Sequence, residues 1–285
     1  MLDVAERLNY QPNSIAAALR KGKSNILGVM VPTSDRNFFA SVIRGIEEVI
    51  RDEGYNLIIC QSDDQYEKEQ LNIDALLKIQ VDGIIASVAK ETTKFEHFEK
   101  VKSQGVPLIL YDRVNESLDV NAVVTNDYLG AYKAVTHLLE QGCKRIVHFA
   151  GKQHINIYQD RLNGYIDAQR EQGIPIENEL IMEEDLIFSM ERVVELGRDL
   201  ADKMLDMQVL PDAIFSSSDF AAMGAMQVLK ERGINIPNDV AIVGYSNDVS
   251  GSFIEPSLTT VDQHTKRMGN LAAKLFHRTI QYPGQ

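Results

Sequence analysis

The sequence is poor in the features that mark secreted, membrane-spanning and metal-binding proteins. It has only two cysteines, Cys60 and Cys143, and neither has a partner at metal-ligand spacing. Each lies beside a predicted strand, so we expect both thiols to pack in the core. No apolar run approaches the ~18 residues of a membrane span, and the first residues lack the basic and apolar regions of a secretory signal. The sequence therefore predicts a cytoplasmic protein without a membrane segment or a metal site.

Basic residues are also in deficit. The chain has 29 lysines and arginines against 41 aspartates and glutamates, a formal net charge of −12 at pH 7. This balance argues against a broad surface for nucleic acid. Residues 1–24 differ, because they carry a net charge of +2, which leaves −14 on residues 25–285. Any affinity for DNA must therefore reside at the N-terminal end.

The sequence lacks the common signatures of enzymes, and we expect neither catalysis nor a cofactor. Gly22-Lys23-Ser24 is similar to the end of a phosphate-binding loop, but Ala17 stands where the first glycine belongs and a predicted strand follows. Neither a Gly-x-Ser-x-Gly elbow nor a His-Glu-x-x-His motif is present. The histidines are scattered, which favours core or surface roles for all six: His97, His137, His148, His154, His264 and His277.

What the sequence does contain is the pattern of two α/β units. A chain of 285 residues with 44% hydrophobic residues suits two domains of moderate size. From residue 26 onward, short apolar runs alternate with longer segments of helical period, which predicts parallel sheets covered on both faces. Strands are expected at residues 26–31, 57–60, 83–86 and 108–111, and in a second series at 145–149, 213–215 and 241–243.

The intervening segments have helical period and end at glycines or prolines. The clearest helix is predicted at residues 38–51. In the second series we expect helices from Asp127, at 158–172, 189–207 and 220–232, and a last one after Pro256. Two similar halves in sequence predict one protein with a cleft between two lobes.

Residues 10–24 predict a short helix that cannot stand alone. Pro12 is excluded from a helix interior, Asn13 or Ser14 can cap the helix that follows, and Gly22 ends it. A helix of about eight residues lies below the ~12–15 needed for marginal stability in water, so it requires partners. Its small residues end in one leucine and a basic cluster, which suits the minor groove of DNA. From composition alone, a solvated linker helix is the alternative.

The same stretch carries a resemblance to a known family. Tyr-x-Pro-Asn, then Ala-x-x-Leu and Gly-x-Ser-x-x-Leu-Gly-Val-x-Val-Pro, from Tyr10 to Pro32, closely resembles the hinge of the lactose-repressor (LacI/GalR) family of bacterial transcription regulators. The resemblance extends to about Gln281. Residues 2–8 look like the last helix of a helix-turn-helix headpiece, whose first two helices have no counterpart here. The few strands that follow the last helix in the family are also absent.

The resemblance implies an architecture and a DNA-binding segment. The expected fold is α/β, with two doubly wound parallel-sheet subdomains of the periplasmic-binding-protein-like type I, an interlobe cleft and a preceding helical hinge. Residues 1–24 would be the headpiece remnant and hinge, residues 25–126 with 257–285 the N-terminal subdomain, and residues 127–256 the C-terminal subdomain. The residues expected to contact DNA are Asn13, Ala16, Leu19, Arg20, Lys21 and Lys23.

Polar residues follow the predicted strands, and ligands of doubly wound sheets bind at the carboxyl ends of strands. Carboxylates and amides beside an aromatic wall suit a polyhydroxylated ligand. Helix capping is the alternative role, above all for Asp127 and Ser218. The predicted effector-binding residues are Asp35, Phe38, Phe39, Asp112, Asp127, Arg161, Asp219, Ser246 and Asn247.

Two of these residues match positions of the family, and one departs from it. Arg161 matches an Arg-x-x-Gly motif whose arginine holds the effector in the family, and its planar five-donor fork can grip a diol or a carboxylate. A surface salt bridge is the alternative. Asp219 matches a cleft position, whereas Ser246 stands where many relatives have aspartate. The missing carboxylate puts a plain hexose effector in doubt.

Together these observations predict a DNA-binding transcriptional regulator, a homodimeric repressor whose operator affinity is altered by a sugar or related metabolite in the cleft. Closure of the cleft would change the spacing of the hinge helices, and linkage requires DNA to change effector affinity by the same factor. The main rival is a periplasmic-type sugar-binding receptor. A second rival is an enzyme on a doubly wound fold, such as a sugar isomerase or nucleosidase.

Overall fold

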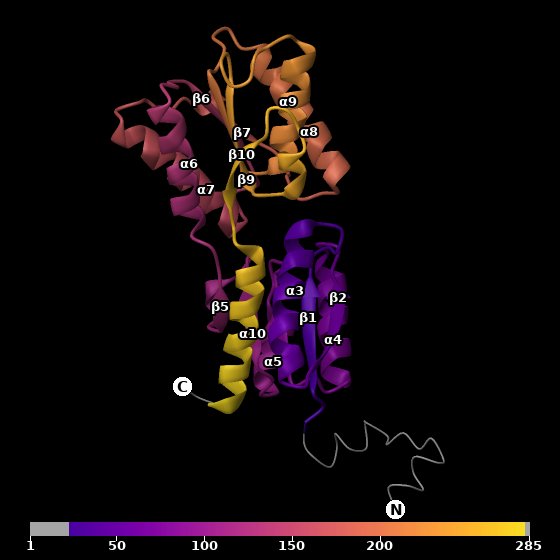
Figure 1. The fold of residues 1–285 in the computed structure, drawn as a ribbon. Coiled ribbons are helices and arrows are strands. Elements are labelled where there is room, and N and C mark those ends of the chain that lie inside the picture. Colours follow the sequence, from indigo (N-terminus) through magenta and orange to yellow (C-terminus); the bar gives the residue numbers. More distant parts are fainter. Residues whose placement is uncertain (1–22, 283–285) are drawn as a thin grey trace, which may run out of the picture.

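The computed structural model describes residues 23–282, which form two α/β lobes (Figure 1). The first lobe has a five-stranded sheet in the order β2-β1-β3-β4-β5, and the second a five-stranded sheet in the order β10-β9-β8-β6-β7. All paired strands are parallel. The predicted fold class is confirmed.

The strands of the first lobe are β1 (Ile26–Val31), β2 (Asn56–Gln61), β3 (Gly83–Ala86), β4 (Leu108–Tyr111) and β5 (Asn121–Val123). Those of the second lobe are β6 (Ile146–Ala150), β7 (Ile181–Glu183), β8 (Ala213–Ser216), β9 (Ala241–Ser246) and β10 (Thr259–Asp262). The central strands are buried on both faces, as the continuous apolar runs predicted.

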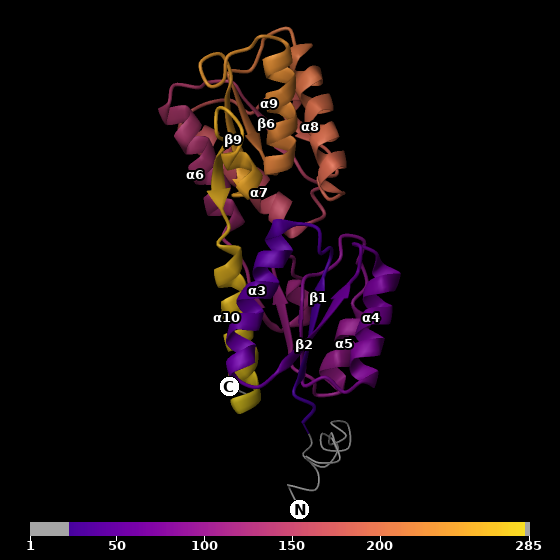
Figure 2. The ribbon, with the colours of Figure 1, turned by 45° about the vertical axis from the view of Figure 1, so that its right-hand side comes forward.

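Helices cover both faces of each sheet (Figures 1 and 2). In the first lobe, α3 (Asn37–Asp52) and α10 (Thr265–Gln281) pack on one face, and α4 (Tyr66–Lys78) and α5 (Glu96–Ser103) on the other. In the second lobe, α6 (Asp127–Glu140) and α7 (Asn156–Glu171) pack on one face, and α8 (Met190–Leu205) and α9 (Asp219–Glu231) on the other. Alternate residues of β1 serve the two cores, since Val29 faces α3 and Met30 faces α4.

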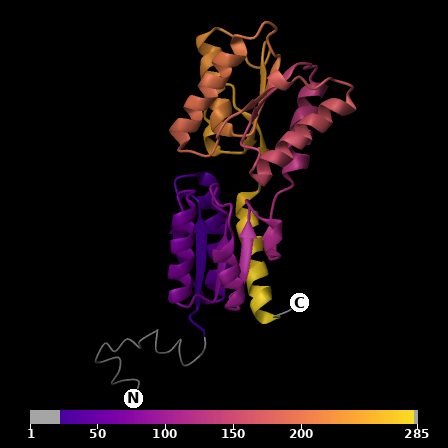
Figure 3. The ribbon, with the colours of Figure 1, turned by 180° about the vertical axis from the view of Figure 1, so that it is seen from behind.

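The predicted domain boundary at residue 257 is contradicted by the pairing of β10. Thr259–Asp262 pairs with β9 in the second sheet, so the chain returns to the first lobe only after Asp262, where α10 begins at Thr265. Among residues 23–282 the chain crosses between the lobes there and between Val123 and Asp127 (Figure 3). Strands β5, β7 and β10 were not predicted, because they are short and only partly buried.

Helix α10 is held against α3 by two glycines. A Cβ atom on Gly269 would lie 2.1 Å from the carbonyl oxygen of Val42, and one on Gly45 would lie 2.2 Å from that of Lys266. The backbones therefore touch, and Asn270 Nδ2 donates to the carbonyl of Gly45 at 3.1 Å. The close packing of α3 and α10 holds the C-terminal helix on the first lobe. It thereby also fixes the position of the connection between the lobes that precedes α10.

Most of the predicted DNA-binding segment lies outside the described residues. Asn13, Ala16, Leu19, Arg20 and Lys21 fall there, and Lys23 is exposed at the start of the described chain. Ser24 anchors the entry to β1, because its backbone N–H and its hydroxyl both donate to Asp82 Oδ1 at 2.8 Å. Within residues 23–282, every helix is too short or too polar to span a bilayer.

Candidate functional site

The carboxyl ends of both sheets face each other across a cavity of about 430 Å³ between the lobes. Its walls come from the first turn of α3, the ends of β4 and β9, the first turns of α7 and α9, and the start of α10. This is the position at which ligands bind to parallel α/β sheets.

Six of the nine predicted effector-binding residues line this cavity: Phe38, Phe39, Asp112, Arg161, Ser246 and Asn247. The other three, Asp35, Asp127 and Asp219, do not line it. Asp35 is exposed in the loop before α3, where its carboxylate accepts a hydrogen bond from the Thr33 hydroxyl at 2.6 Å. That loop directs Asp35 to solvent, whereas Arg36 and the helix that follows line the cavity.

Asp127 is buried beneath the cavity wall and positions Arg161. Nε and Nη2 of Arg161 lie 2.8 and 2.7 Å from Asp127 Oδ1, and Nη1 donates to the carbonyl of Ser217 at 2.9 Å. The arginine is only 4% exposed, which excludes the surface salt bridge considered as its alternative. Burial alone would lower the pKa of Arg161, but the adjacent Asp127 carboxylate raises it overall. The guanidinium is therefore a fixed cation at the cavity.

Asp219 shapes the loop after β9. It is fully buried and accepts hydrogen bonds from the backbone N–H of Asp248 at 2.7 Å and from the Thr260 hydroxyl at 2.6 Å. A Cβ atom on Gly244 would lie 2.2 Å from Asp219 Oδ1, so the carboxylate needs a glycine beside it. The loop turns through positive φ at Ser246, 133°, a conformation that is strained for a residue with a side chain. Asp219 thus orients lining residues from behind.

Asp112 is the carboxylate that the protein leaves available to a ligand. It lies at the end of β4 with a left-handed φ of 59° and is 5% exposed. Arg113 Nε is 3.7 Å from its Oδ2, beyond hydrogen-bond distance, and the Arg113 guanidinium instead pairs with Asp64. Burial raises the pKa of Asp112 to about 6, although Arg113 opposes the rise. Hydroxyl donors of a ligand would meet these free acceptor sites.

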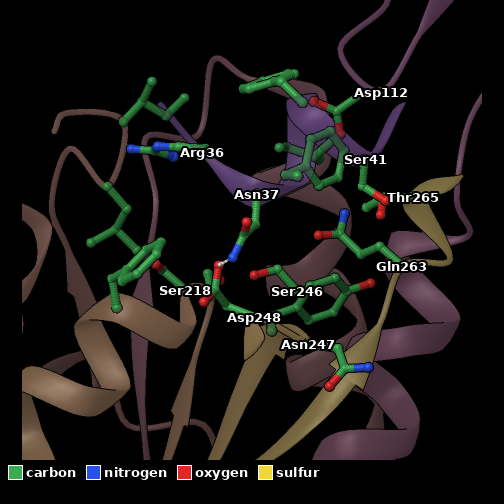
Figure 4. A pocket seen from close by; sticks show the side chains of 18 of the residues that line it. Arg36, Asn37, Ser41, Asp112, Ser218, Ser246, Asn247, Asp248, Gln263 and Thr265 are labelled. Carbon is green, nitrogen blue, oxygen red and sulfur yellow. Dashed lines mark hydrogen bonds between the residues drawn. The ribbon is translucent and has the colours of Figure 1, made fainter. Parts of the chain in front are cut away.

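Further lining residues were absent from the predicted set. They include Arg36, Asn37, Ser41, Arg44, Arg113, Tyr158, Leu186, Ile187, Phe220, Tyr245, Asp248, Gln263 and Thr265. Asn37 extends from α3 toward the second lobe, where its Nδ2 donates to Asp248 Oδ2 at 3.4 Å (Figure 4). Gln263 and Thr265 lie where the chain crosses back to the first lobe. They were not predicted, because the crossing was expected at residue 257. The polar residues after each strand were a usable signal for Asn37 and Asp248.

Aromatic rings complete the walls. The guanidinium carbon of Arg161 lies 3.7 Å from the centroid of the Tyr245 ring and 5.4 Å from that of the Tyr158 ring. Phe38 and Phe39 meet edge to face, 4.9 Å between centroids. Rings combined with amide, hydroxyl and carboxylate groups from both lobes suit a small molecule that is flat or apolar on one face and rich in hydroxyls elsewhere. Among residues 23–282, no three His, Cys, Asp or Glu side chains cluster as a metal site.

Comparison with known proteins identifies the family and the fold. The family model of periplasmic binding proteins and the sugar-binding domain of the LacI family matches residues 24–284. The chain belongs to this family. The match covers both lobes of this LacI-family protein, including the two crossings and the whole cavity.

Its curated relatives are transcriptional repressors. The HTH-type transcriptional repressor PurR of Actinobacillus pleuropneumoniae is 30% identical over 279 residues, which are 98% of this chain and 81% of that protein. The ribose operon repressor of Halalkalibacterium halodurans is 31% identical over 282 residues, 99% of this chain and 80% of the relative. A LacI family transcriptional regulator from Enterococcus faecium, solved with bound ribose, has a TM-score of 0.78 at 28% identity and covers 91% of this chain and 92% of its own.

These likenesses settle the class of this LacI-family protein. It is a transcriptional regulator of the repressor type, responsive to a small molecule, and it is not an enzyme. The receptor and enzyme alternatives are not supported. The ligand of this cavity depends on the side chains described above.

Proposed function

We propose that this regulator binds a neutral, polyhydroxylated metabolite of monosaccharide or nucleoside size between its lobes, and that occupancy changes its affinity for operator DNA. The cavity carries this proposal. Its ~430 Å³ lies toward the small end of the ~300–1,000 Å³ range of ligand pockets. The Enterococcus faecium regulator was solved with ribose, so D-ribose is the first compound to test.

The lining residues divide by role in this proposal. Asp112 accepts ligand hydroxyls, Arg161 donates to ligand oxygens, and Phe38 and Phe39 cover an apolar face. Ser246 and Asn247 contribute from the second lobe. Asp127 and Asp219 act indirectly, because each is hydrogen-bonded to a neighbour that faces the cavity. Asp35 has no part in binding.

The charge of the lining supports a neutral ligand. Four arginines line the cavity. Arg161 is paired with Asp127, Arg113 with Asp64 and Arg44 with Glu48. Arg36 instead donates to the carbonyl of Phe188. The cavity carboxylates Asp112 and Asp248 would repel an anionic group placed beside them. A sugar or a nucleoside meets this arrangement better than a sugar bisphosphate does.

The regulator would act as a homodimer in the cytoplasm. Exposed apolar side chains support a second copy as the partner, with Leu71 of α4 at 67% exposure and Phe253 of the second lobe at 81%. An apolar groove of about 500 Å³, lined by Met190, Met223 and Met226, lies in the same lobe as Phe253. A dimer built on both lobes would transmit their relative movement to its N-terminal segments.

In the full-length protein those N-terminal segments would contact the operator. Residues 14–21 would fold as a helix only when two copies pack in the minor groove, with Leu19 as the wedge. The accompanying DNA contacts would come from Asn13, Ala16, Arg20, Lys21 and Lys23. Cavity occupancy would set the spacing of the two first lobes and thereby decide whether the helices form.

A thermal-shift screen tests the ligand proposal. D-ribose, other pentoses and hexoses, their phosphates, purines and nucleosides are added to the parent chain, and a ligand raises the melting temperature by mass action. We expect a concentration-dependent rise with a neutral sugar or nucleoside, which Asp112→Asn reduces at least about tenfold in apparent affinity.

Asp35→Asn is the matched control, because it removes a carboxylate that was equally plausible from sequence but lies outside the cavity. It should bind as the parent does. A parent response to none of these compounds, or equal responses from the Asp112 and Asp35 variants, would contradict the proposal.

A further inference from the structure

A short segment of the second lobe lies across one side of the cavity. We call residues 185–188, between β7 and α8, the strap. Leu186 and Ile187 line the cavity and are 0% and 5% exposed, and Phe188 follows at 47%. The strap therefore forms part of the cavity wall although it belongs to no helix or strand.

The first lobe holds the strap through Lys90, which follows β3. Its Nζ donates to Asp185 Oδ2 at 3.0 Å and to the carbonyl of Ile187 at 2.9 Å. The same ammonium lies 4.1 Å from the centroid of the Phe188 ring, within the range of a cation–π contact. The Lys90 side chain is only 15% exposed, so solvent and salt screen these contacts less than they screen a surface pair.

The strap is shaped to receive this cation. Asp185 Oδ1 accepts the backbone N–H of Ile187 at 3.0 Å, which fixes the turn within the second lobe and leaves Oδ2 for Lys90. Arg36, before α3, donates to the carbonyl of Phe188. Two cations of the first lobe thus bind consecutive carbonyls of the strap.

The backbone of Lys90 is also connected to the cavity wall, through Asp64. Its backbone N–H donates to Asp64 Oδ1 at 2.9 Å, and Asp64 forms the ion pair with Arg113, the neighbour of Asp112. A ligand on Asp112 and the contacts of Lys90 therefore share one network of hydrogen bonds and ion pairs within the first lobe.

We propose that the strap is the gate of the cavity and that Lys90 is the positioning residue that holds it shut. All three contacts of the Lys90 ammonium are with the second lobe, so opening the lobes breaks all of them at once. Lys90 thereby sets the ratio of open to closed molecules before any ligand arrives. The inference is independent of which metabolite the cavity takes.

The test measures the distance between the lobes by double electron–electron resonance, without ligand. Spin labels are attached to Lys94→Cys in the first lobe and Glu191→Cys in the second, both exposed positions, in a chain carrying Cys60→Ala and Cys143→Ala. We expect one narrow, short distance in this parent. Lys90→Met keeps the length of the side chain but not its charge, and should raise the ratio of open to closed molecules roughly tenfold, about 1.4 kcal/mol.

Three further variants separate the latch from a general structural effect. Asp185→Asn keeps the acceptor for Ile187 N–H and loses only the charge, so it should broaden the distances as Lys90→Met does. Lys90→Arg should restore the short distance. Lys203→Met removes the pair with Glu184, 3.1 Å, which lies next to the strap but entirely within the second lobe, and should leave the distances unchanged.

The proposal is overturned if Lys90→Met gives the parent's distribution, if the parent itself is already broad, or if Lys203→Met has the same effect as Lys90→Met. Because no ligand is present, these outcomes are separate from the outcome of the sugar screen.

Discussion

Asp112 shows how much of the site depends on the surroundings of one side chain. Its carboxylate is almost fully buried, lies beyond hydrogen-bond distance of Arg113, and has a pKa raised to about 6 by burial. A buried carboxylate without a hydrogen-bond donor lowers the stability of the ligand-free protein. A bound ligand offsets this desolvation free energy when it donates hydrogen bonds to the carboxylate. Binding sites commonly hold such groups.

The Asp112→Asn variant should therefore be more stable than the parent at neutral pH. The unfolded carboxyl loses its proton near its usual pKa of 3.8, whereas the folded one retains it to about 6. The folded state binds more protons in this window, so the contribution of Asp112 to stability falls as pH rises from about 4 to about 6 and stays low above. Asparagine avoids this loss and tolerates the left-handed backbone of 59°.

Urea unfolding measures the difference. At pH 7.5 we expect Asp112→Asn to exceed the parent by on the order of 2 kcal/mol, and the gap should narrow as the pH is lowered toward 4. Asp35→Asn, at an exposed position, should stay within about 0.5 kcal/mol of the parent at every pH. If the difference in unfolding free energy between Asp112→Asn and the parent grew as the pH was lowered, burial of Asp112 would not be the cause of its raised pKa.

Sequence patterns located lining residues better than they assigned roles. Phe38, Phe39 and Asp112 were found because side chains after a buried strand meet at one edge of a parallel sheet. The same reasoning could not distinguish Asp112 from Asp127 or Asp219, because the distinction is whether the carboxylate faces the cavity or a buried partner. That depends on packing between segments distant in sequence.

At the scale of elements, long helices and buried strands were predictable and short edge strands were not. The apolar runs gave β1, β3 and β4 with their observed bounds, since these strands are buried on both faces. In contrast, Thr259–Asp262 is polar, half-exposed and four residues long, so nothing local marks it as a strand. Only its pairing with β9 defines it, and the boundary of the second lobe shifted with it.

The crossing of α3 and α10 predicts a large effect from a small substitution. In Gly269→Ala the new methyl group would meet the carbonyl oxygen of Val42 at 2.1 Å, so the helices must separate. We expect a loss of roughly 1–3 kcal/mol in the free energy of unfolding, despite the better helix propensity of alanine. Lys274→Ala, on the exposed face of α10, is the control and should cost little in the same urea titration. Equal stabilities of the two variants would mean that the close approach is not required.

At the scale of the whole molecule, the charge is distributed unevenly, because residues 1–24 are net basic and the rest of the chain is strongly acidic. With −14 on residues 25–285, the lobes are not suited to lie along DNA, and for this reason the sequence predicts the DNA contacts within residues 1–24. The position of each lobe relative to the other could not be read from sequence, because it depends on interlobe pairs such as Asn37 with Asp248 and Lys90 with Asp185.

The Leu19→Ala variant of the full-length protein tests the predicted role of Leu19 in binding operator DNA. Removing the apolar wedge should weaken operator binding more than about tenfold. Without the leucine side chain, no apolar contact offsets the free energy needed to unstack the base step. Effector affinity should not change, because Leu19 precedes both lobes. A gel-shift titration with the operator measures the first and calorimetry the second. Unchanged operator affinity would remove the wedge role.

The most direct measurement uses the absence of tryptophan from the chain. Phe38→Trp places a single indole at a half-buried position in the cavity wall, so all tryptophan emission comes from the cavity. The account predicts a saturable change in emission with D-ribose or another neutral sugar or nucleoside, shifted to higher concentration by Asp112→Asn. No change with any of these compounds at millimolar concentration, in a folded protein, would contradict it.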